Sequence, residues 1–229
     1  MPNDMSQTDR IIVVDEGLTD YRTIWDKQLG LMQHICGNKK NGVPTGNEWI
    51  LLTEHKPVIT LGRHGKASNL ICPPEILEKK GIECIQIERG GDITFHGPGQ
   101  LVVYPILDLE LHSMGIKAYI NFLEQSVISL LAAFGIKGEI VDDAPGVWID
   151  PGTGRDRKIC AIGVKSSRYV TMHGLAINVN TDLDYFSLIN PCGFVDKGVT
   201  SISRELRHPV DMQLVKDRLI EIMLARLKR

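Results

Sequence analysis

The sequence Arg89-Gly-Gly-Asp-Ile-Thr-Phe-His96-Gly-Pro-Gly-Gln100 leads directly into the apolar run Leu101–Leu107. Glycines let a backbone approach a ligand closely and adopt positive φ, and the exposed N–H groups of such a loop can bind a carbonyl oxygen or an anion. The loop lacks the Gly-Lys-Ser/Thr ending of a P-loop and the G-x-G-x-x-G pattern of a dinucleotide site. It therefore predicts a backbone-lined pocket, in a loop that joins a strand at Ile82–Ile87 to one at Leu101–Leu107.

Outward from this loop, strands come in neighbouring pairs and helices lie between groups of strands. Apolar residues recur at helical spacing in Tyr21–Ile35, in Tyr119–Phe134 and in the tail from Asp211. This order favours an α+β domain with a mixed sheet over a regularly alternating α/β fold. The other expected elements are a short helix at Pro74–Lys80 and strands at Ile11–Val14, Trp49–Thr53, Val58–Leu61, Gly138–Val141, Val147–Ile149, Lys158–Val164 and Leu175–Val179.

The size and composition indicate one domain over residues 1–229. Hydrophobic residues make up 43% of the chain, enough for a continuous core. The polar segment 1–9 is expected to be disordered, and the segment after about Thr200 is the one possible second unit. The net charge of -2 gives no reason to expect a nucleic-acid partner.

The cysteines and the apolar runs of the sequence predict where in the cell the protein is found. Five cysteines, none in a C-x-x-C pair, argue against a disulfide framework and against a structural zinc site. The polar N-terminus lacks the apolar core of a signal peptide, and no apolar run approaches the roughly 20 residues that cross a bilayer. We expect a cytoplasmic protein without a membrane partner. The sequence shows no coiled-coil or other obvious oligomerisation pattern, so we expect a monomer.

A thiol and a lysine are the main candidates for chemistry. Cys192 lies at a turn, in Asn190-Pro-Cys192-Gly193. An isolated cysteine is more often a small buried hydrophobe, but a turn gives access to a substrate. A free thiol with a pKa of about 8.5 is only slightly ionised at neutral pH, so a nucleophilic Cys192 needs a cationic neighbour. Lys158, on an apolar strand, is the candidate, and the pair predicts acyl transfer through a thioester.

Cys160 complicates this assignment. Strand alternation places residues 158 and 160 on the same face, so both thiols are expected to be able to approach the lysine. Cys192 is preferred because a turn is accessible and a strand usually is not.

The histidines do not indicate a metal site. His55, His64, His96 and His173 form neither H-E-x-x-H nor another dense ligand cluster. His96 and His173 are interpreted as pocket residues, and His55 as a structural loop residue.

Five motifs follow one another between about Trp49 and Gly193. They are Glu54-His-x-Pro-Val-x-Thr-x-Gly62, the glycine-rich stretch Arg89–Gln100, Lys158-Ile-x-Ala-Ile-Gly163, His173-Gly-Leu-Ala-x-Asn178 and Pro191-Cys-Gly193. Together, and in this order, they resemble the lipoate biosynthesis octanoyltransferases, also called lipoyl(octanoyl) transferases. One departure is Cys160, where a smaller residue such as alanine or serine is expected.

The resemblance implies a fold and a reaction. The fold is that of the biotin/lipoate protein ligase catalytic domain. The reaction moves octanoyl from an acyl carrier protein to one lysine of a lipoyl domain, in 2-oxoacid dehydrogenase E2 subunits or the glycine-cleavage H protein. No metal, ATP or other cofactor is implied.

The resemblance also implies roles for individual residues. Cys192 carries the octanoyl thioester, and Lys158 lowers the cysteine pKa and assists proton transfer. The residues implied to line the acyl pocket are Arg89, Gly90, Gly91, Asp92, Ile93, Thr94, Phe95, His96, Ala161, Ile162, Gly163, Gly174, Leu175 and Ala176.

Three other readings stay open. An ATP-dependent lipoate or biotin ligase on the same fold would activate a free acid, although no ligase-type adenylate loop is evident. A Cys–His thioesterase or amidase would pass the acyl group to water. A non-catalytic module that binds an acyl carrier would keep its function without Cys192.

Overall fold

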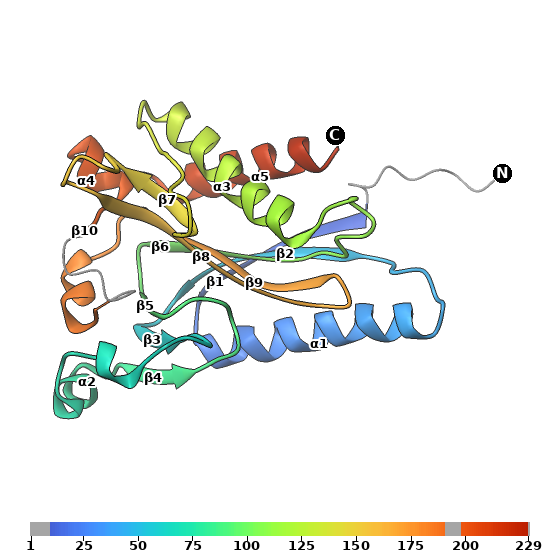
Figure 1. Ribbon diagram of the computed structural model, residues 1–229, viewed down its shortest axis with the longest axis horizontal. Helices are drawn as coiled ribbons and strands as arrows, with labels where there is room; N and C mark the ends of the chain where they lie inside the picture. The colour runs from blue at the N-terminus through green and yellow to red at the C-terminus, as the bar shows by residue number, and fades with distance from the viewer. Residues whose placement is uncertain (1–9, 191–197, 229) are drawn as a thin grey trace.

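A seven-stranded mixed sheet runs through the middle of the molecule (Figure 1). The computed structural model describes residues 10–190 and 198–228. The order is β1 (Ile11–Thr19), β2 (Glu48–His55), β6 (Gln100–Ile106), β9 (Val170–Asn178), β8 (Arg157–Ser167) and β10 (Gly198–Val199), with β7 (Gly146–Ile149) also paired to β8. Neighbouring strands of the sheet are antiparallel, except that β1 pairs with β2 and β8 with β10 in parallel.

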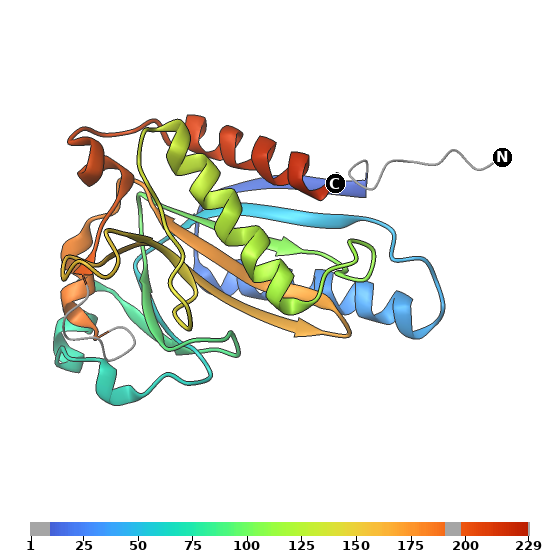
Figure 2. The ribbon, with the colours of Figure 1, turned by 45° about the horizontal axis from the view of Figure 1, so that its top comes forward.

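Helices cover both faces of this sheet. Helices α3 (Ile116–Ala133) and α5 (Met212–Leu227) lie side by side on one face, and α1 (Tyr21–Lys40) lies on the other (Figures 1 and 2). The side chain of Asp211 accepts a hydrogen bond from the Gln213 N–H and caps α5. In the part of the chain that the structure describes, no helix has the length and apolarity needed to cross a bilayer.

The core is split by the sheet into two layers. On β6, Leu101 and Val103 pack into the cluster under α3 and α5, whereas Val102 and Tyr104 pack into the cluster over α1. Since side chains alternate along a strand, the uninterrupted apolar run of β6 is what a strand buried on both faces requires. Helix α5 contributes Leu219 to the same cluster as α3, so the segment after Thr200 shares the main core.

A second, three-stranded sheet lies beside the first. It consists of β4 (Glu83–Gln86), β3 (Val58–Leu61) and β5 (Ile93–His96), in that order. Strand β5 is part of the glycine-rich stretch, which therefore supplies a strand and not only a connection. Around these sheets lie α2 (Pro74–Lys80), α4 (Ile202–Leu206) and the 3₁₀ turns η2 (Ala67–Asn69) and η3 (Leu183–Leu188).

The predicted α+β fold with a mixed sheet is confirmed, but the strand predicted at Gly138–Val141 is wrong. Only Glu139 pairs there, through two backbone hydrogen bonds of 2.9 Å with Trp148. The chain then turns at Asp142 and Asp143, and Asp143 adopts a left-handed φ of 58°. Pairing therefore stops after a single residue.

Replacing Gly174 with alanine should destabilise the fold by about 3 kcal/mol, the upper end of the usual cost of overpacking, because the backbone around this site must move. A Cβ at this position of β9 would lie 2.1 Å from the Val103 carbonyl oxygen and 2.9 Å from Pro105 Cδ. Urea unfolding of the variant measures the loss. Gly30→Ala is the matched control, since nothing lies within 4 Å of that Cβ on the exposed face of α1. It should stabilise by up to about 1 kcal/mol, and an equally stable Gly174→Ala variant would contradict the packing argument.

Candidate active site

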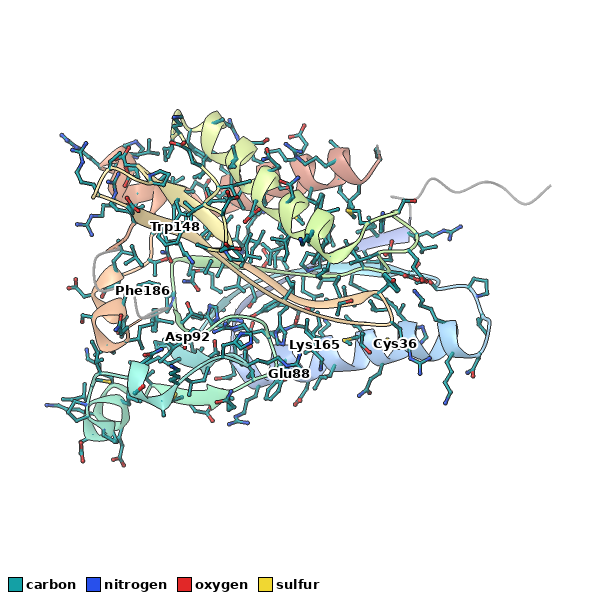
Figure 3. All side chains as sticks on the ribbon, viewed as in Figure 1. Cys36, Glu88, Asp92, Trp148, Lys165 and Phe186 are labelled. Atoms are coloured by element: carbon teal, nitrogen blue, oxygen red, sulfur yellow. The ribbon has the colours of Figure 1, made fainter. Side chains whose placement is uncertain are left out.

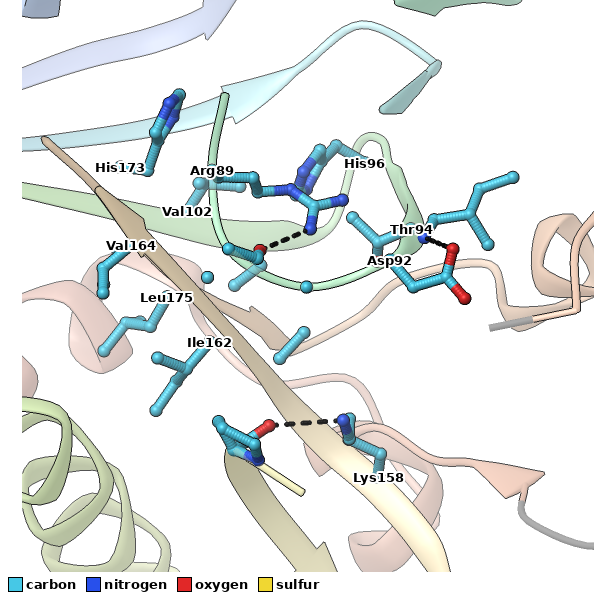
Figure 4. A pocket seen from close by; sticks show the side chains of 18 of the residues that line it. Arg89, Asp92, Thr94, His96, Val102, Lys158, Ile162, Val164, His173 and Leu175 are labelled. Carbon is cyan, nitrogen blue, oxygen red and sulfur yellow. Dashed lines mark hydrogen bonds between the residues drawn. The ribbon is translucent and has the colours of Figure 1, made fainter. Parts of the chain in front are cut away.

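A cavity of about 570 Å³ lies between the two sheets and follows strand β8. This volume is in the range of sites for small molecules. Figure 4 shows Lys158 at one end of the β8 segment and Val164 at the other, with Arg89 and His96 across the strand from Ile162. The predicted pocket residues that line it are Arg89, Gly90, Gly91, Asp92, Ile93, Thr94, His96, Ala161, Ile162, Gly163, Gly174, Leu175 and Ala176, and Lys158 lines it as well.

The glycine-rich stretch is held against β8 by close backbone contacts. The Gly90 N–H donates to the Val164 carbonyl (2.9 Å), and the Gly62 N–H donates to the Asp92 carbonyl (3.0 Å). A Cβ on Gly163 would lie 2.8 Å from the Gly90 carbonyl oxygen, and a Cβ on Gly62 would lie 2.4 Å from that of Gly91. The glycines of separate motifs thus meet because the backbones pack too closely for a side chain.

Arg89 is a buried cation on this stretch. Its guanidinium donates to the carbonyl and the hydroxyl oxygen of Thr60, both at 3.0 Å, and to the Gly90 carbonyl at 3.0 Å. Only 8% of the residue is exposed. These bonds to neutral oxygens fix the guanidinium at the wall of the cavity.

Phe95 is placed differently from the other residues of the stretch. The lining of the cavity includes Thr94 and His96 but not Phe95. On β5 the side chain of Phe95 points to the other face, where it stacks on Tyr185 with ring centroids 4.7 Å apart and meets Phe186 edge-on at 5.7 Å. The prediction that Phe95 lines the pocket is therefore corrected, and strand alternation is the reason.

Lys158 lies where β7, β8 and β10 meet. Its ammonium donates to the Pro145 carbonyl (3.3 Å) and lies 4.5 Å from the centre of the Trp148 ring. Trp148 and Pro145 also line the cavity, and Figure 3 shows Trp148 on β7 below α3. The strand β10 pairs Val199 with Lys158. The predicted nucleophile, Cys192, falls in 191–197 and lies outside the described residues.

Cys160 does not share a face with Lys158, and that prediction is wrong. Lys158 pairs with Trp148, but Cys160 pairs with Val147, so β8 carries one extra residue, Ile159, at a bulge. Adjacent residues of β7 point to opposite faces, and the same then holds for Lys158 and Cys160. Cys160 is fully buried in the core under α3, and burial raises the pKa of its thiol.

Polar rings form a cluster beside the cavity on the side of α1, made of Tyr21, His55, His96, Tyr104 and His173. His55 lies between the Thr19 carbonyl, 3.2 Å from Nδ1, and the Tyr104 hydroxyl, 2.8 Å from Nε2. A carbonyl only accepts, so Nδ1 of His55 carries the proton and the Tyr104 hydroxyl donates to Nε2. Burial lowers the pKa of His55 to about 4, which keeps this imidazole neutral.

The side-chain amides of Gln100 and Asn178 orient His96 through a series of hydrogen bonds. The side-chain N–H₂ of Gln100 donates to the Phe95 carbonyl (3.2 Å) and to Asn178 Oδ1 (2.9 Å). Gln100 Oε1 therefore accepts, and His96 Nδ1–H donates to it at 2.7 Å. Burial, followed by the neighbouring His55, lowers the pKa of His96 to about 3. In the neutral ring the other nitrogen, Nε2, is a hydrogen-bond acceptor.

His55→Gln should flatten the acid dependence of stability. As the pH falls, the unfolded chain binds a proton at His55 near pH 6.5 while the folded chain resists until about pH 4. The free energy of unfolding therefore declines across that window, by about 3 kcal/mol for this group. Glutamine can keep both hydrogen bonds but takes up no proton. Urea unfolding at pH 7, 5.5 and 4 measures the slope, and an unchanged slope in the variant would refute the buried neutral histidine.

Sequence reasoning identified the loop, the β8 and β9 segments and both pocket histidines, but it missed part of the lining. Tyr104, Trp148 and Pro145 also line the cavity. Tyr104 is part of an apolar strand, and its hydroxyl was the one available signal, since a buried phenol needs a partner. Among residues 10–190 and 198–228, no three His, Cys, Asp or Glu side chains are grouped as metal ligands would be.

Comparison with known proteins gives a family. Residues 20–224 match the lipoyl protein ligase A/B catalytic domain. The chain is 50% identical to the octanoyltransferase of Parabacteroides distasonis over 92% of this chain and 95% of that protein. It is also 50% identical to the octanoyltransferase of Bacteroides fragilis, over 95% of this chain and 98% of that protein.

A solved structure with the same fold is the archaeal bipartite lipoate protein ligase of Thermoplasma acidophilum. The TM-score is 0.65 at 16% identity, over 95% of this chain and 89% of that one. This likeness shows the fold, and the sequence relatives show the family within it. The chain belongs to the octanoyltransferases of the lipoyl protein ligase A/B catalytic domain family.

Proposed function

We propose that this acyltransferase moves octanoyl from an acyl carrier protein to one lysine of a lipoyl domain, through a thioester on Cys192, in the first step of endogenous protein lipoylation. The acceptors would be lipoyl domains of 2-oxoacid dehydrogenase E2 subunits and the glycine-cleavage H protein. The observation that supports this most is that a single cavity is lined by the glycine-rich, β8 and β9 motifs and reaches Lys158.

The cavity has walls that suit an alkyl chain next to Lys158. Ile116 and Ile120 of α3 and Ile162 and Leu175 of the sheet line it. Burying an alkyl chain against such walls is favourable by about 0.8 kcal/mol per CH₂. The carbonyl of the chain would then lie near the Lys158 ammonium, with its alkyl part along β8.

The first step exchanges one thioester for another. The Cys192 thiolate attacks the carbonyl carbon of the octanoyl-carrier thioester, and the bond from that carbon to the carrier sulfur breaks. The carrier thiolate leaves and takes a proton from the Lys158 ammonium. Because a thioester is replaced by a thioester, we expect the step to be nearly thermoneutral and to need no ATP or metal.

The second step forms an amide and must first free the acceptor amine of its proton. A lysine amine has a pKa of about 10.4, so removing its proton at pH 7 costs about 4–5 kcal/mol. A neutral Lys158 is a stronger base than His96, because burial lowers the pKa of His96 to about 3. We therefore assign the proton to Lys158. The acceptor nitrogen then attacks the acyl carbon, the bond from that carbon to the Cys192 sulfur breaks, and the Cys192 thiolate leaves. The remaining surplus proton of the nitrogen passes to solvent, which returns Cys192 and Lys158 to the thiolate and the ammonium.

The test combines octanoyl-acyl carrier protein with an unmodified lipoyl domain, without ATP. The expected result is one octanoyl amide on the lipoyl domain. Free octanoate with ATP, but no carrier protein, should give no product, whereas product there would indicate a ligase. Release of octanoate without any acceptor would indicate a thioesterase. Either result, in place of transfer from the carrier, would overturn the proposal.

A further inference from the structure

A buried carboxylate lies in the core beside the reacting end of the cavity. Glu124 of α3 is only 5% exposed, and its neighbours on the helix, Leu123 and Val127, belong to the main apolar cluster. Burying a carboxylate among apolar side chains is costly unless it is paired or hydrogen-bonded, and the two steps proposed above do not use this group. Ile120, one turn earlier on α3, lines the cavity, so this stretch of the helix borders the site.

One peptide group connects Glu124 to Lys158. The Gly146 N–H donates to Glu124 Oε1 at 3.1 Å. The carbonyl of Pro145 belongs to the same peptide group and accepts from the Lys158 ammonium at 3.3 Å, the dashed line at Lys158 in Figure 4. Since the N–H and C=O of a trans peptide point in opposite directions, the carboxylate and the ammonium lie on opposite sides of it. The two contacts and the bond lengths of a peptide place them at most about 9 Å apart.

The backbone around this peptide is held close to β8. The Trp148 indole N–H donates to the Ala144 carbonyl at 3.0 Å. Gly146 has a φ of 128°, which favours glycine, and a Cβ there would lie 2.3 Å from the Cys160 carbonyl oxygen. Within this fixed segment, Glu124 binds the N–H of the peptide that presents its carbonyl to Lys158.

The charges of Glu124 and Lys158 favour one another. Burial raises the pKa of the Glu124 carboxyl, whereas the Gly146 hydrogen bond and the Lys158 charge act in the opposite direction. Coupling between two sites is reciprocal, so a carboxylate that the ammonium stabilises must stabilise the ammonium by the same amount.

Other titratable groups also surround Lys158. The buried Cys160 thiol interacts with both charges, and Asp143 lines the cavity but is exposed. Arg157, the preceding residue of β8, is held in ion pairs with two other carboxylates. The strands β7 and β10 on either side of Lys158 carry no charged residue. Glu124 is the most deeply buried carboxylate of this group, so solvent screens its charge least.

We propose that Glu124 is a positioning residue for the reaction: its carboxylate holds the peptide between Pro145 and Gly146 with the carbonyl toward Lys158, and its charge keeps Lys158 in the ammonium form. The first step needs that form, because the leaving carrier thiolate takes its proton from the Lys158 ammonium. Glu124 is not among the residues that line the cavity, so it acts through the peptide and not on the substrate. The role in catalysis rests on the proposed function, whereas the effect on Lys158 does not.

The first measurement needs no substrate. Labelling of the folded protein with a trace of trinitrobenzenesulfonate, followed by peptide mass spectrometry, gives the pH at which the Lys158 amine becomes reactive. Glu124→Gln keeps an oxygen that can accept from Gly146 but removes the charge, so this midpoint should fall by roughly one pH unit, the effect of one charge about 9 Å away. Glu221→Gln is the matched control, because Glu221 is exposed on α5, and it should leave the midpoint in place. An unchanged midpoint in Glu124→Gln would overturn the inference.

The second measurement follows octanoyl loading from octanoyl-acyl carrier protein, without an acceptor, by intact-protein mass. The wild-type rate should fall at alkaline pH as Lys158 loses its proton, and in Glu124→Gln this fall should begin roughly one pH unit lower. Glu124→Met leaves the Gly146 N–H without its acceptor and should load roughly tenfold more slowly at every pH.

The outcomes separate this inference from the proposed function. A merely structural role would slow both Glu124 variants without moving the pH profile, and that result would overturn the inference. A shifted amine midpoint together with no loading in the wild type would overturn the proposed function, while the effect of Glu124 on Lys158 would stand.

Discussion

Replacing Cys192 with alanine is expected to abolish octanoyl transfer, with a loss of roughly ten-thousand-fold or more, as removal of a nucleophile usually gives. Without the thiol, the acceptor lysine would have to attack the carrier thioester directly. Steady-state transfer to a lipoyl domain measures the effect, and Cys192→Ser should be nearly as slow because a hydroxyl ionises far less readily than a thiol.

The matched control for this variant is Cys160→Ala. Cys160 is buried in the core and lies on the face of β8 opposite to Lys158, so the variant should retain transfer near the wild-type rate. Full activity in Cys192→Ala, or loss of activity only in Cys160→Ala, would remove Cys192 from the mechanism.

Replacing Lys158 with alanine is expected to lower kcat roughly 100- to 10,000-fold, the range over which a positioned acid or base acts. The proposed mechanism uses this lysine twice, to favour the thiolate and to carry the proton between the two steps. Lys158→Met removes the charge with less loss of packing than Lys158→Ala. The methionine side chain can still contact the Trp148 ring, whose centre lies 4.5 Å from the Lys158 ammonium. Lys137→Ala is the control, because the Lys137 side chain is 83% exposed.

Lys158→Arg separates the two roles. Arginine keeps the positive charge but does not give up its proton. This variant should preserve the reactivity of the thiol toward iodoacetamide at pH 7, but it should transfer octanoyl to the lipoyl domain as slowly as Lys158→Ala. Transfer at the wild-type rate by Lys158→Arg would show that the lysine contributes charge alone.

Long elements with a strong pattern could be predicted from the sequence. Strand β6 is buried on both faces and reads as an apolar run, and α3 is buried on one face and shows helical spacing. Both patterns can be recognised within the segment itself. The strand β5 could not be recognised, because its four residues lie within a glycine-rich stretch and pair with β3 from a distant part of the chain. The same holds for the pairing of Glu139, which ends after one residue.

The site was predictable where motif residues contact the cavity through backbone. The glycines of β8, β9 and the loop lie so close to neighbouring backbone that a Cβ would clash, as the glycine-rich motifs predict. Side-chain directions were less predictable. The bulge at Ile159 reverses the faces of Lys158 and Cys160, and a bulge is visible only in the pairing with β7. Phe95 points away from the cavity because side chains alternate along the strand β5. The His173 N–H, on a left-handed backbone, donates to Gln28 of the distant helix α1.

Charge pairs near the site also depend on the fold. Glu88 and Lys165 lie side by side below the sheet (Figure 3), with an ion pair of 2.9 Å. They are 77 residues apart in the chain, and the sequence gives no sign of their contact. The two charges act in opposite directions on His173, since Glu88 raises its pKa and Lys165 lowers it, and burial is the larger effect that lowers the pKa.

The central claim is that the acyl group rests on Cys192 between the two steps. The most direct measurement is the intact-protein mass of the wild type after incubation with octanoyl-acyl carrier protein and no acceptor, alongside Cys192→Ala and Cys160→Ala. The account predicts an octanoyl adduct that hydroxylamine removes in the wild type and in Cys160→Ala, and no adduct in Cys192→Ala. An adduct that persists in Cys192→Ala, or none in the wild type, would contradict it.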